Sequence, residues 1–189
     1  MTVPNILTLL RLLALPVILL MFRSGRGLAA AAVFVVAMLT DCADGWLARK
    51  SGQRSVLGLY FDAVVDKIVI LVLLYELAMA GMMSPVAAHL FLARELLQSA
   101  VRSAGASRQR VIGANWMGKT KAFLQVVLVT CGLALSAIVA GQGLDKRVPL
   151  IVFETAVWGV LAVTWCFFGV FVFQNRALLL ERPDSSGRR

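Results

Sequence analysis

Residues 41–66 read DCADGWLARKSGQRSVLGLYFDAVVD, and they place four aspartates inside a chain that is otherwise strongly apolar. Asp41 and Asp44 follow one apolar run, whereas Asp62 and Asp66 lie near the start of the next. A short polar connection, KSGQRS at residues 50–55, separates the two pairs. Carboxylates at membrane depth are costly and by default mark a functional site. The stretch therefore predicts two antiparallel helices whose acidic faces oppose each other near one membrane surface.

The composition of the whole chain is that of an integral membrane protein. Of the 189 residues, 60% are hydrophobic and 15% are charged, and the mean hydropathy is +0.84. A helix of roughly 20 apolar residues crosses the hydrocarbon layer, where an open sheet cannot satisfy its backbone. We therefore expect an all-α, polytopic membrane protein with six transmembrane helices, at residues 6–22, 28–47, 57–80, 85–100, 122–141 and 150–173.

These spans predict a single transmembrane domain over residues 1–180, which would contain the site. The last residues, 181–189, read ERPDSSGRR and are polar and charged. Such a composition cannot bury enough apolar surface to fold, so we expect a disordered tail there.

The basic residues predict the orientation of the helices. The net charge is +9, and most Lys and Arg residues follow the second and fourth spans or lie at the carboxyl end. An excess of this kind is typical of cytoplasmic loops, so we expect the aspartates near the cytoplasmic side. The basic loops would also attract anionic membrane lipids. We expect no nucleic-acid partner, because basic and aromatic residues do not alternate along the chain.

The helical period places the acids and small residues of each predicted helix on one face. The first face carries Asp41, Asp44, Gly45 and Ala48, and the second carries Gly58, Asp62 and Asp66. Carboxylates this close raise one another's pKa unless cations neutralise them. Oxygen ligands favour a hard divalent cation, Mg²⁺ or Mn²⁺, and two ions would suit four aspartates. Paired ions of this kind are common where a displacement occurs at phosphorus.

The small residues leave room for a bulky group between the acidic faces, and a diphosphate is the natural candidate. Arg49 could donate two parallel hydrogen bonds to its phosphate oxygens, and Ser55 could donate another. A structural interpretation of the aspartates is that they form interfacial ion pairs with Arg49, Lys50, Arg54 or Lys67. A cation or proton transporter is a further alternative, but the acids cluster near one side and no paired repeats are evident.

The stretch from Asp41 to Asp66 matches the pattern D-x2-D-G-x2-A-R-x8-G-x3-D-x3-D at every fixed position, and it therefore resembles the CDP-alcohol phosphatidyltransferase family. The resemblance implies a six-helix, homodimeric membrane enzyme that transfers a phosphatidyl group from a CDP-linked lipid to an alcohol and releases CMP. It also implies that Asp41, Asp44 and Asp62 are metal ligands. Asp66 would be a ligand that also removes the proton of the acceptor hydroxyl.

The same resemblance implies a binding site for the CDP-lipid. Gly45, Arg49 and Ser55 would contact the nucleotide and the diphosphate, beside the small residues Ala48 and Gly58. Residues 4–11, PNILTLLR, could turn the polar atoms of Asn5 and Thr8 inward, and we assign both to this site. The alternative is that Asn5 and Thr8 cap the first helix.

The flanking segments favour one acceptor. Residues 4–11, ARE at 93–95, and GKTK at 118–121 followed by Gln125 resemble bacterial family members that use CDP-diacylglycerol and glycerol 3-phosphate. This resemblance implies a place in the bacterial inner membrane, with the active site on the cytoplasmic side. A phosphorylated acceptor needs cations, and we expect them to be Arg94, Arg102, Lys119 and Lys121. The alternative is that these cations reflect the excess of basic residues in cytoplasmic loops or, for Arg94, a local pair with Glu95.

The connection RSAGASRQR at residues 102–110 differs from the pattern of those members. Serine, an inositol phosphate or phosphatidylglycerol therefore stay open as acceptors. An uncharged acceptor would leave the basic residues without a role.

Overall fold

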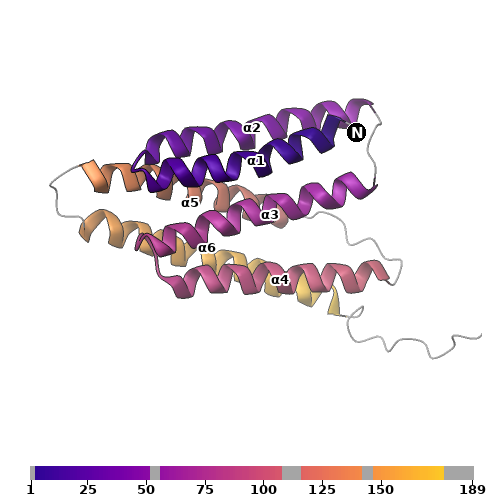
Figure 1. Cartoon of the computed structure of the whole chain (residues 1–189). Coiled ribbons are helices and arrows are strands. Elements are labelled where there is room, and N and C mark those ends of the chain that lie inside the picture. The colour runs from indigo at the N-terminus through magenta and orange to yellow at the C-terminus, as the bar shows by residue number, and fades with distance from the viewer. Residues whose placement is uncertain (1–2, 52–55, 108–115, 142–146, 177–189) are drawn as a thin grey trace, which may run out of the picture.

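The computed structural model describes residues 3–51, 56–107, 116–141 and 147–176. Six α-helices make up this part of the chain, and it contains no strand (Figure 1). Each of them contains most or all of one predicted span, so the all-α fold class and the helix positions are confirmed. The helices are α1 Val3–Arg23, α2 Gly27–Ser51, α3 Val56–Met79, α4 Pro85–Ser107, α5 Trp116–Gly141 and α6 Arg147–Gln174.

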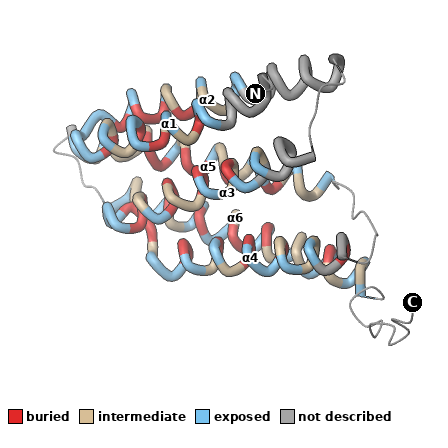
Figure 2. Tube along the Cα trace, turned by 45° about the vertical axis from the view of Figure 1, so that its right-hand side comes forward, coloured by how far each residue is buried: buried red, intermediate tan, exposed pale blue. Residues whose placement is uncertain are grey.

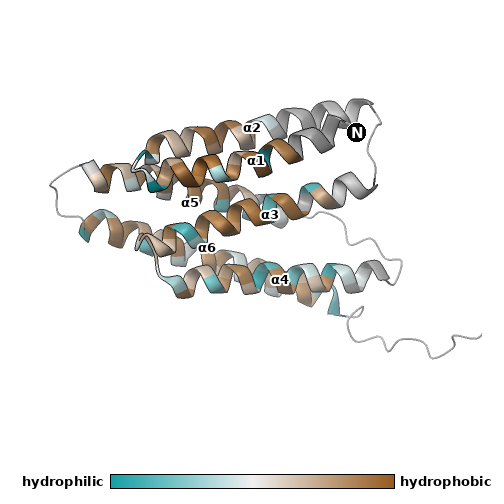
Figure 3. Ribbon diagram, viewed as in Figure 1, coloured by the Kyte–Doolittle hydropathy of each residue, from teal (hydrophilic) through white to brown (hydrophobic). Residues whose placement is uncertain are grey.

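Two of the described helices are long and apolar enough to cross a membrane, at Trp116–Ala140 and Arg147–Gln174. A shorter apolar stretch lies at Gly27–Thr40. The prediction of six membrane-crossing helices is therefore confirmed only in part. Large apolar side chains are nonetheless exposed on other helices too, for example Leu20 on α1 and Met79 on α3. Figure 3 shows apolar residues along most of the bundle.

Consecutive helices run antiparallel, so their connections gather at two ends of the bundle (Figure 1). The α1–α2 and α3–α4 connections lie at one end, which we call the tight-turn end. Here Gly25 and Gly81 adopt φ values of 78° and 72°. Each closes a helix with the same pair of backbone hydrogen bonds, such as Met82 N to Leu77 O and Gly81 N to Ala78 O. Left-handed backbone at this position favours glycine, so both turns follow directly from the sequence.

The core lies between the helices rather than on their outer faces, as the burial pattern in Figure 2 shows. α1 packs against both α2 and α3, α2 packs against α5, and α6 packs against α4 and α5. Gly132 permits the close approach of three helices, because a Cβ there would lie 2.6 Å from Leu77 Cδ1 and 2.8 Å from Phe153 Cζ. The largest fully buried apolar side chains include Phe34, Leu73, Leu77, Phe91 and Leu133.

The packing differs from the sequence-based expectation in one respect. We expected α2 and α3 to oppose each other directly, whereas the described part of α2 packs mainly against α1 and α5. α1 contacts both α2 and α3 and therefore brings its own side chains to the acidic face of α3. A short connection determines that two helices are antiparallel, but a third helix can still pack against both.

Candidate active site

Two carboxylates of α3 share one cation from α1. Asp62 and Asp66 lie one turn apart, and the guanidinium of Arg11 donates hydrogen bonds to both. The distance from Arg11 Nη2 to Asp62 Oδ1 is 2.9 Å. Arg11 is 4% exposed, whereas each carboxylate side chain is 40% exposed. The four-residue spacing thus places both acids on one face, as predicted, and they remain accessible to a ligand.

Arg11 was not among the predicted site residues, although the sequence contains a signal for it. It is the one charged residue between Met1 and Phe22, inside an otherwise apolar run. A buried guanidinium needs a carboxylate partner, and the aspartates of a neighbouring helix provide two. The sequence could therefore have indicated a pairing, but the choice of α3 depends on how the helices pack.

Several predicted site residues lie outside the described side chains. They are Asp41, Asp44, Gly45, Ala48 and Arg49 of α2, together with Asn5, Thr8, Ser55 and Gly58. Among the described side chains, no group of three or more His, Cys, Asp or Glu could hold a metal ion. The convergence of four carboxylates around two ions therefore stays a prediction.

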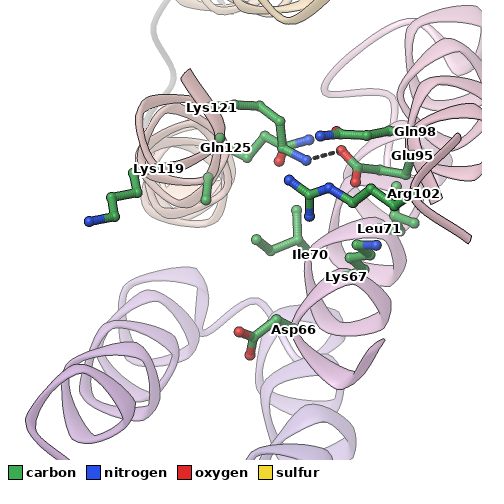
Figure 4. Close-up of a pocket in the computed structure, with 12 residues that line it drawn as sticks. Asp66, Lys67, Ile70, Leu71, Glu95, Gln98, Arg102, Lys119, Lys121 and Gln125 are labelled. Carbon is green, nitrogen blue, oxygen red and sulfur yellow. Dashed lines mark hydrogen bonds and ion pairs between the residues drawn. The ribbon is translucent and has the colours of Figure 1, made fainter. Parts of the chain in front are cut away.

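A cavity of about 310 Å³ lies beside Asp66, between α3, α4 and α5 (Figure 4). Its size is that of a pocket for a small molecule. Its lining combines apolar residues with several cations and amides. The lining residues are Asp66, Lys67, Ile70, Leu71, Glu95, Gln98, Arg102, Gly118, Lys119, Lys121, Ala122 and Gln125.

Buried ionic interactions hold one wall of this cavity. Glu95 Oε1 accepts hydrogen bonds from Lys121 Nζ of α5 and, at 2.9 Å, from Arg94 Nη1. Arg94 Nε also donates to the backbone carbonyl of Thr164 on α6, at 3.2 Å. Removing one member would leave a buried charge uncompensated, so these contacts tie α4, α5 and α6 together.

The four cations predicted to bind the acceptor occupy different positions. Lys121 and Arg102 line the cavity, whereas Arg94 is 2% exposed and is not among the lining residues. Lys119 also lines the cavity, but its ammonium points away from Lys121 and Glu95 in Figure 4. The geometry therefore favours Lys121 and Arg102 over Arg94 and Lys119 as ligand contacts.

Lys67 is a further cation at the cavity, and the sequence analysis considered it only as an ion-pair partner. Its ammonium donates to Ser99 Oγ at 2.8 Å. Arg102 lies nearby, with its guanidinium carbon 5.9 Å from the ring centroid of Phe171. Lys67 follows Asp66 directly, so a cation next to a predicted catalytic carboxylate was the available signal. Together with Lys121, these residues make the cavity basic and suited to an anion.

Comparison with known proteins identifies the class to which this fold and site belong. The family model described as CDP-alcohol phosphatidyltransferase matches residues 1–166. The chain therefore belongs to this family, which confirms the resemblance carried by the aspartate pattern.

Individual relatives give a consistent picture. A protein of Mycobacterium tuberculosis strain H37Rv, named probable phosphatidylglycerophosphate synthase, is 40% identical over 131 residues, which are 66% of this chain and 62% of that protein. The match thus spans less than two thirds of the mycobacterial protein's length. Two proteins named CDP-diacylglycerol–glycerol-3-phosphate 3-phosphatidyltransferase are each 34% identical. The Rickettsia felis protein aligns over 74% of this chain and 75% of its own length. For the Escherichia coli K12 protein these shares are 66% and 72%.

Proposed function

We propose that this protein transfers the phosphatidyl group of CDP-diacylglycerol to glycerol 3-phosphate, forming phosphatidylglycerophosphate and CMP. One observation carries the proposal: Asp66, the last acid of the family pattern, borders a cavity that also presents Lys67, Arg102 and Lys121. Asp66 could therefore remove a proton from a molecule bound in this cavity, and the cations suit a phosphorylated acceptor. The names of the relatives support the same reaction.

In this proposal the acceptor hydroxyl attacks the phosphorus that bears the lipid. A new phosphorus–oxygen bond forms, and the bond from that phosphorus to the CMP oxygen breaks, so CMP leaves with the electron pair. Asp66 takes the hydroxyl proton, for which it must lie within hydrogen-bond reach of the acceptor. Arg11 fixes the orientation of Asp66 and Asp62 through its hydrogen bonds.

Asp41, Asp44, Asp62 and Asp66 would hold two divalent cations, Mg²⁺ or Mn²⁺. Asp62 and Asp66 fit such ions because their carboxylates supply oxygen ligands. Both carboxylates already accept hydrogen bonds from one positive group, Arg11. When bound, the ions would neutralise charge on the diphosphate. Gly45, Ala48, Arg49, Ser55 and Gly58, with Asn5 and Thr8, would contact the CDP-lipid.

The proposal includes the membrane arrangement. The shortest of the described helices has 21 residues, which at about 1.5 Å per residue is sufficient to cross a bilayer core. Six spans would leave the acyl chains of the donor in lipid. Acceptor and CMP would exchange with water on the cytoplasmic side of a bacterial inner membrane. Homodimerisation belongs to the proposal because the family resemblance implies it.

The test is CMP release by the purified full-length protein with CDP-diacylglycerol and Mg²⁺. Glycerol 3-phosphate, serine, inositol, inositol phosphate and phosphatidylglycerol are added one at a time. We expect release with glycerol 3-phosphate and little with the others. Selective release with another alcohol would retain the reaction and contradict the acceptor. Absence of release with every acceptor, in Mg²⁺ and in Mn²⁺, would contradict the reaction itself.

A further inference from the structure

Two arginines of α1 form ion pairs with α3, one toward each end of this helix pair. At the tight-turn end, Arg23 is 68% exposed and donates to both oxygens of one carboxylate, that of Glu76. Toward the other end, Arg11 is 4% exposed and donates to two different carboxylates, from Nη1 to Asp66 and from Nη2 to Asp62. The first is an ordinary surface ion pair, whereas the second brings two like charges together around one buried cation.

The two carboxylates and the guanidinium depend on each other. Like charges four residues apart on a helix destabilise it, and the repulsion grows where burial limits solvent screening. The planar guanidinium of Arg11 offsets this repulsion, because its separate N–H groups reach Asp62 and Asp66 at the same time. Arg11 in turn needs the carboxylates, since an uncompensated buried charge is strongly destabilising.

A divalent cation held by Asp62 and Asp66 would compete with Arg11. The hydrogen bonds from Arg11 use Oδ1 of each carboxylate, and carboxylate oxygens are also the ligands that Mg²⁺ and Mn²⁺ take. Positive groups that share the same carboxylates oppose each other's binding by charge repulsion. Such coupling is reciprocal, so a cation that stabilises the acid pair by itself also lowers the affinity of the pair for a metal ion.

We infer that Arg11 is a positioning residue that keeps Asp62 and Asp66 in place without a metal ion and weakens metal binding as a result. The pair of acids thus exchanges divalent cations without loss of the contact between α1 and α3. This inference rests on the metal ions of the proposed function and is independent of its acceptor.

The first measurement is the Tm of the purified full-length protein in EDTA and in saturating MgCl₂. KCl keeps the ionic strength equal, so that screening does not imitate binding. Arg11→Met removes the charge and keeps an apolar side chain. In EDTA we expect this variant to melt about 6–20 °C below the unmodified protein, because one partner of a buried ion pair is lost. In MgCl₂ we expect about half of this difference or more to disappear, because the metal ions replace the missing charge.

The second measurement is the affinity for Mn²⁺, read from the electron paramagnetic resonance signal of the free ion. We expect Arg11→Met to bind Mn²⁺ about 10-fold more tightly than the unmodified protein, because the competing cation is gone. A side chain that only joined two helices would not produce this gain. Neither measurement requires a substrate.

Arg23→Met is the matched control, because it makes the same substitution on the same helix, in an ion pair with the same partner helix. Its Tm should fall equally in EDTA and in MgCl₂, and its affinity for Mn²⁺ should not change. Arg11→Lys keeps the charge but loses the planar fork, so it should show the pattern of Arg11→Met to a smaller extent. It decides the question if Arg11→Met does not fold.

Equal losses of Tm in EDTA and in MgCl₂, or an unchanged or weaker affinity for Mn²⁺, would overturn the inference. The deciding variant is Arg11→Met, or Arg11→Lys where only that variant folds. Such a result together with CMP release by the unmodified protein would leave the proposed reaction intact. The expected Tm and Mn²⁺ results without CMP release from any acceptor would instead contradict the proposed reaction and support the inference.

Discussion

The two ends of the helix bundle treat their polar groups differently. At the tight-turn end, Arg23 donates to both oxygens of Glu76, at 2.5 and 2.9 Å. Glu154 of α6 accepts from the backbone of Ser84 and from Trp158 Nε1, each at 2.8 Å. At the other end, Lys67, Arg102 and Lys121 line the cavity beside Asp66. The comparison contrasts polar groups that join the turns to neighbouring helices with polar groups that line a cavity.

The largest effect should follow from replacing Asp66, to which we assign two roles, proton acceptor and metal ligand. Asp66→Asn keeps the shape of the side chain but removes the proposed base and one proposed metal ligand. We expect kcat for CMP release to fall by about 10²- to 10⁴-fold, with the KM for CDP-diacylglycerol changed much less. Equal losses in turnover and in donor binding would indicate that Asp66 acts mainly as a metal ligand. Activity close to that of the unmodified protein would remove it from the reaction.

A smaller effect should distinguish two lysines on the same helix. Lys121 lines the cavity and is 8% exposed, whereas the ammonium of Lys119 points away from it (Figure 4). We expect Lys121→Met to lower kcat/KM for glycerol 3-phosphate by about 10- to 100-fold and Lys119→Met by about threefold or less. Steady-state kinetics at saturating donor would measure both variants. Similar losses of kcat/KM in the two variants would mean that both lysines reach the acceptor. That result would contradict the orientation of α5 in Figure 4.

The smallest effect on activity should come from the tight-turn end. Glu154→Gln weakens hydrogen bonds that join α6 to the α3–α4 turn and to Trp158. Exchanging charge-assisted hydrogen bonds for neutral ones costs about 1 kcal/mol, so the Tm should fall by about 2–4 °C. Thermal unfolding and CMP release would be measured on the same sample. A large loss of turnover at unchanged Tm would show that the two ends do not divide structure from function in this way.

The apolar runs predicted the helices well, and the errors are informative. The start of α4 at Pro85 and the end of α5 at Gly141 were predicted correctly. The end of α4 lies at Ser107 instead of residue 100, and α5 begins at Trp116 instead of residue 122. These additional turns carry polar residues of the cavity, such as Arg102 and Lys121. The predicted spans left out these turns because hydropathy measures only how apolar a segment is. The helices continue through them because their polar side chains line the cavity or form ion pairs.

The candidate site was predictable where it depends on spacing within one helix. Asp62 and Asp66 share a face because residues four apart are neighbours on a helix. Contacts between helices were not predictable in this way. Arg11, Lys67 and Gln98 became site residues only because α1, α4 and α5 pack around α3 as they do. Sequence distance gives no information about the rotation of one helix against another.

Local apolarity and fixed spacing were sufficient to predict the number and positions of the helices, the location of the acids, and the family. The cations that reach the cavity were set by helix packing. Arg94 and Lys121 both pair with Glu95, yet only Lys121 lines the pocket. Lys119, two residues away, points elsewhere, because each helical residue turns by about 100° and packing sets which direction faces inward.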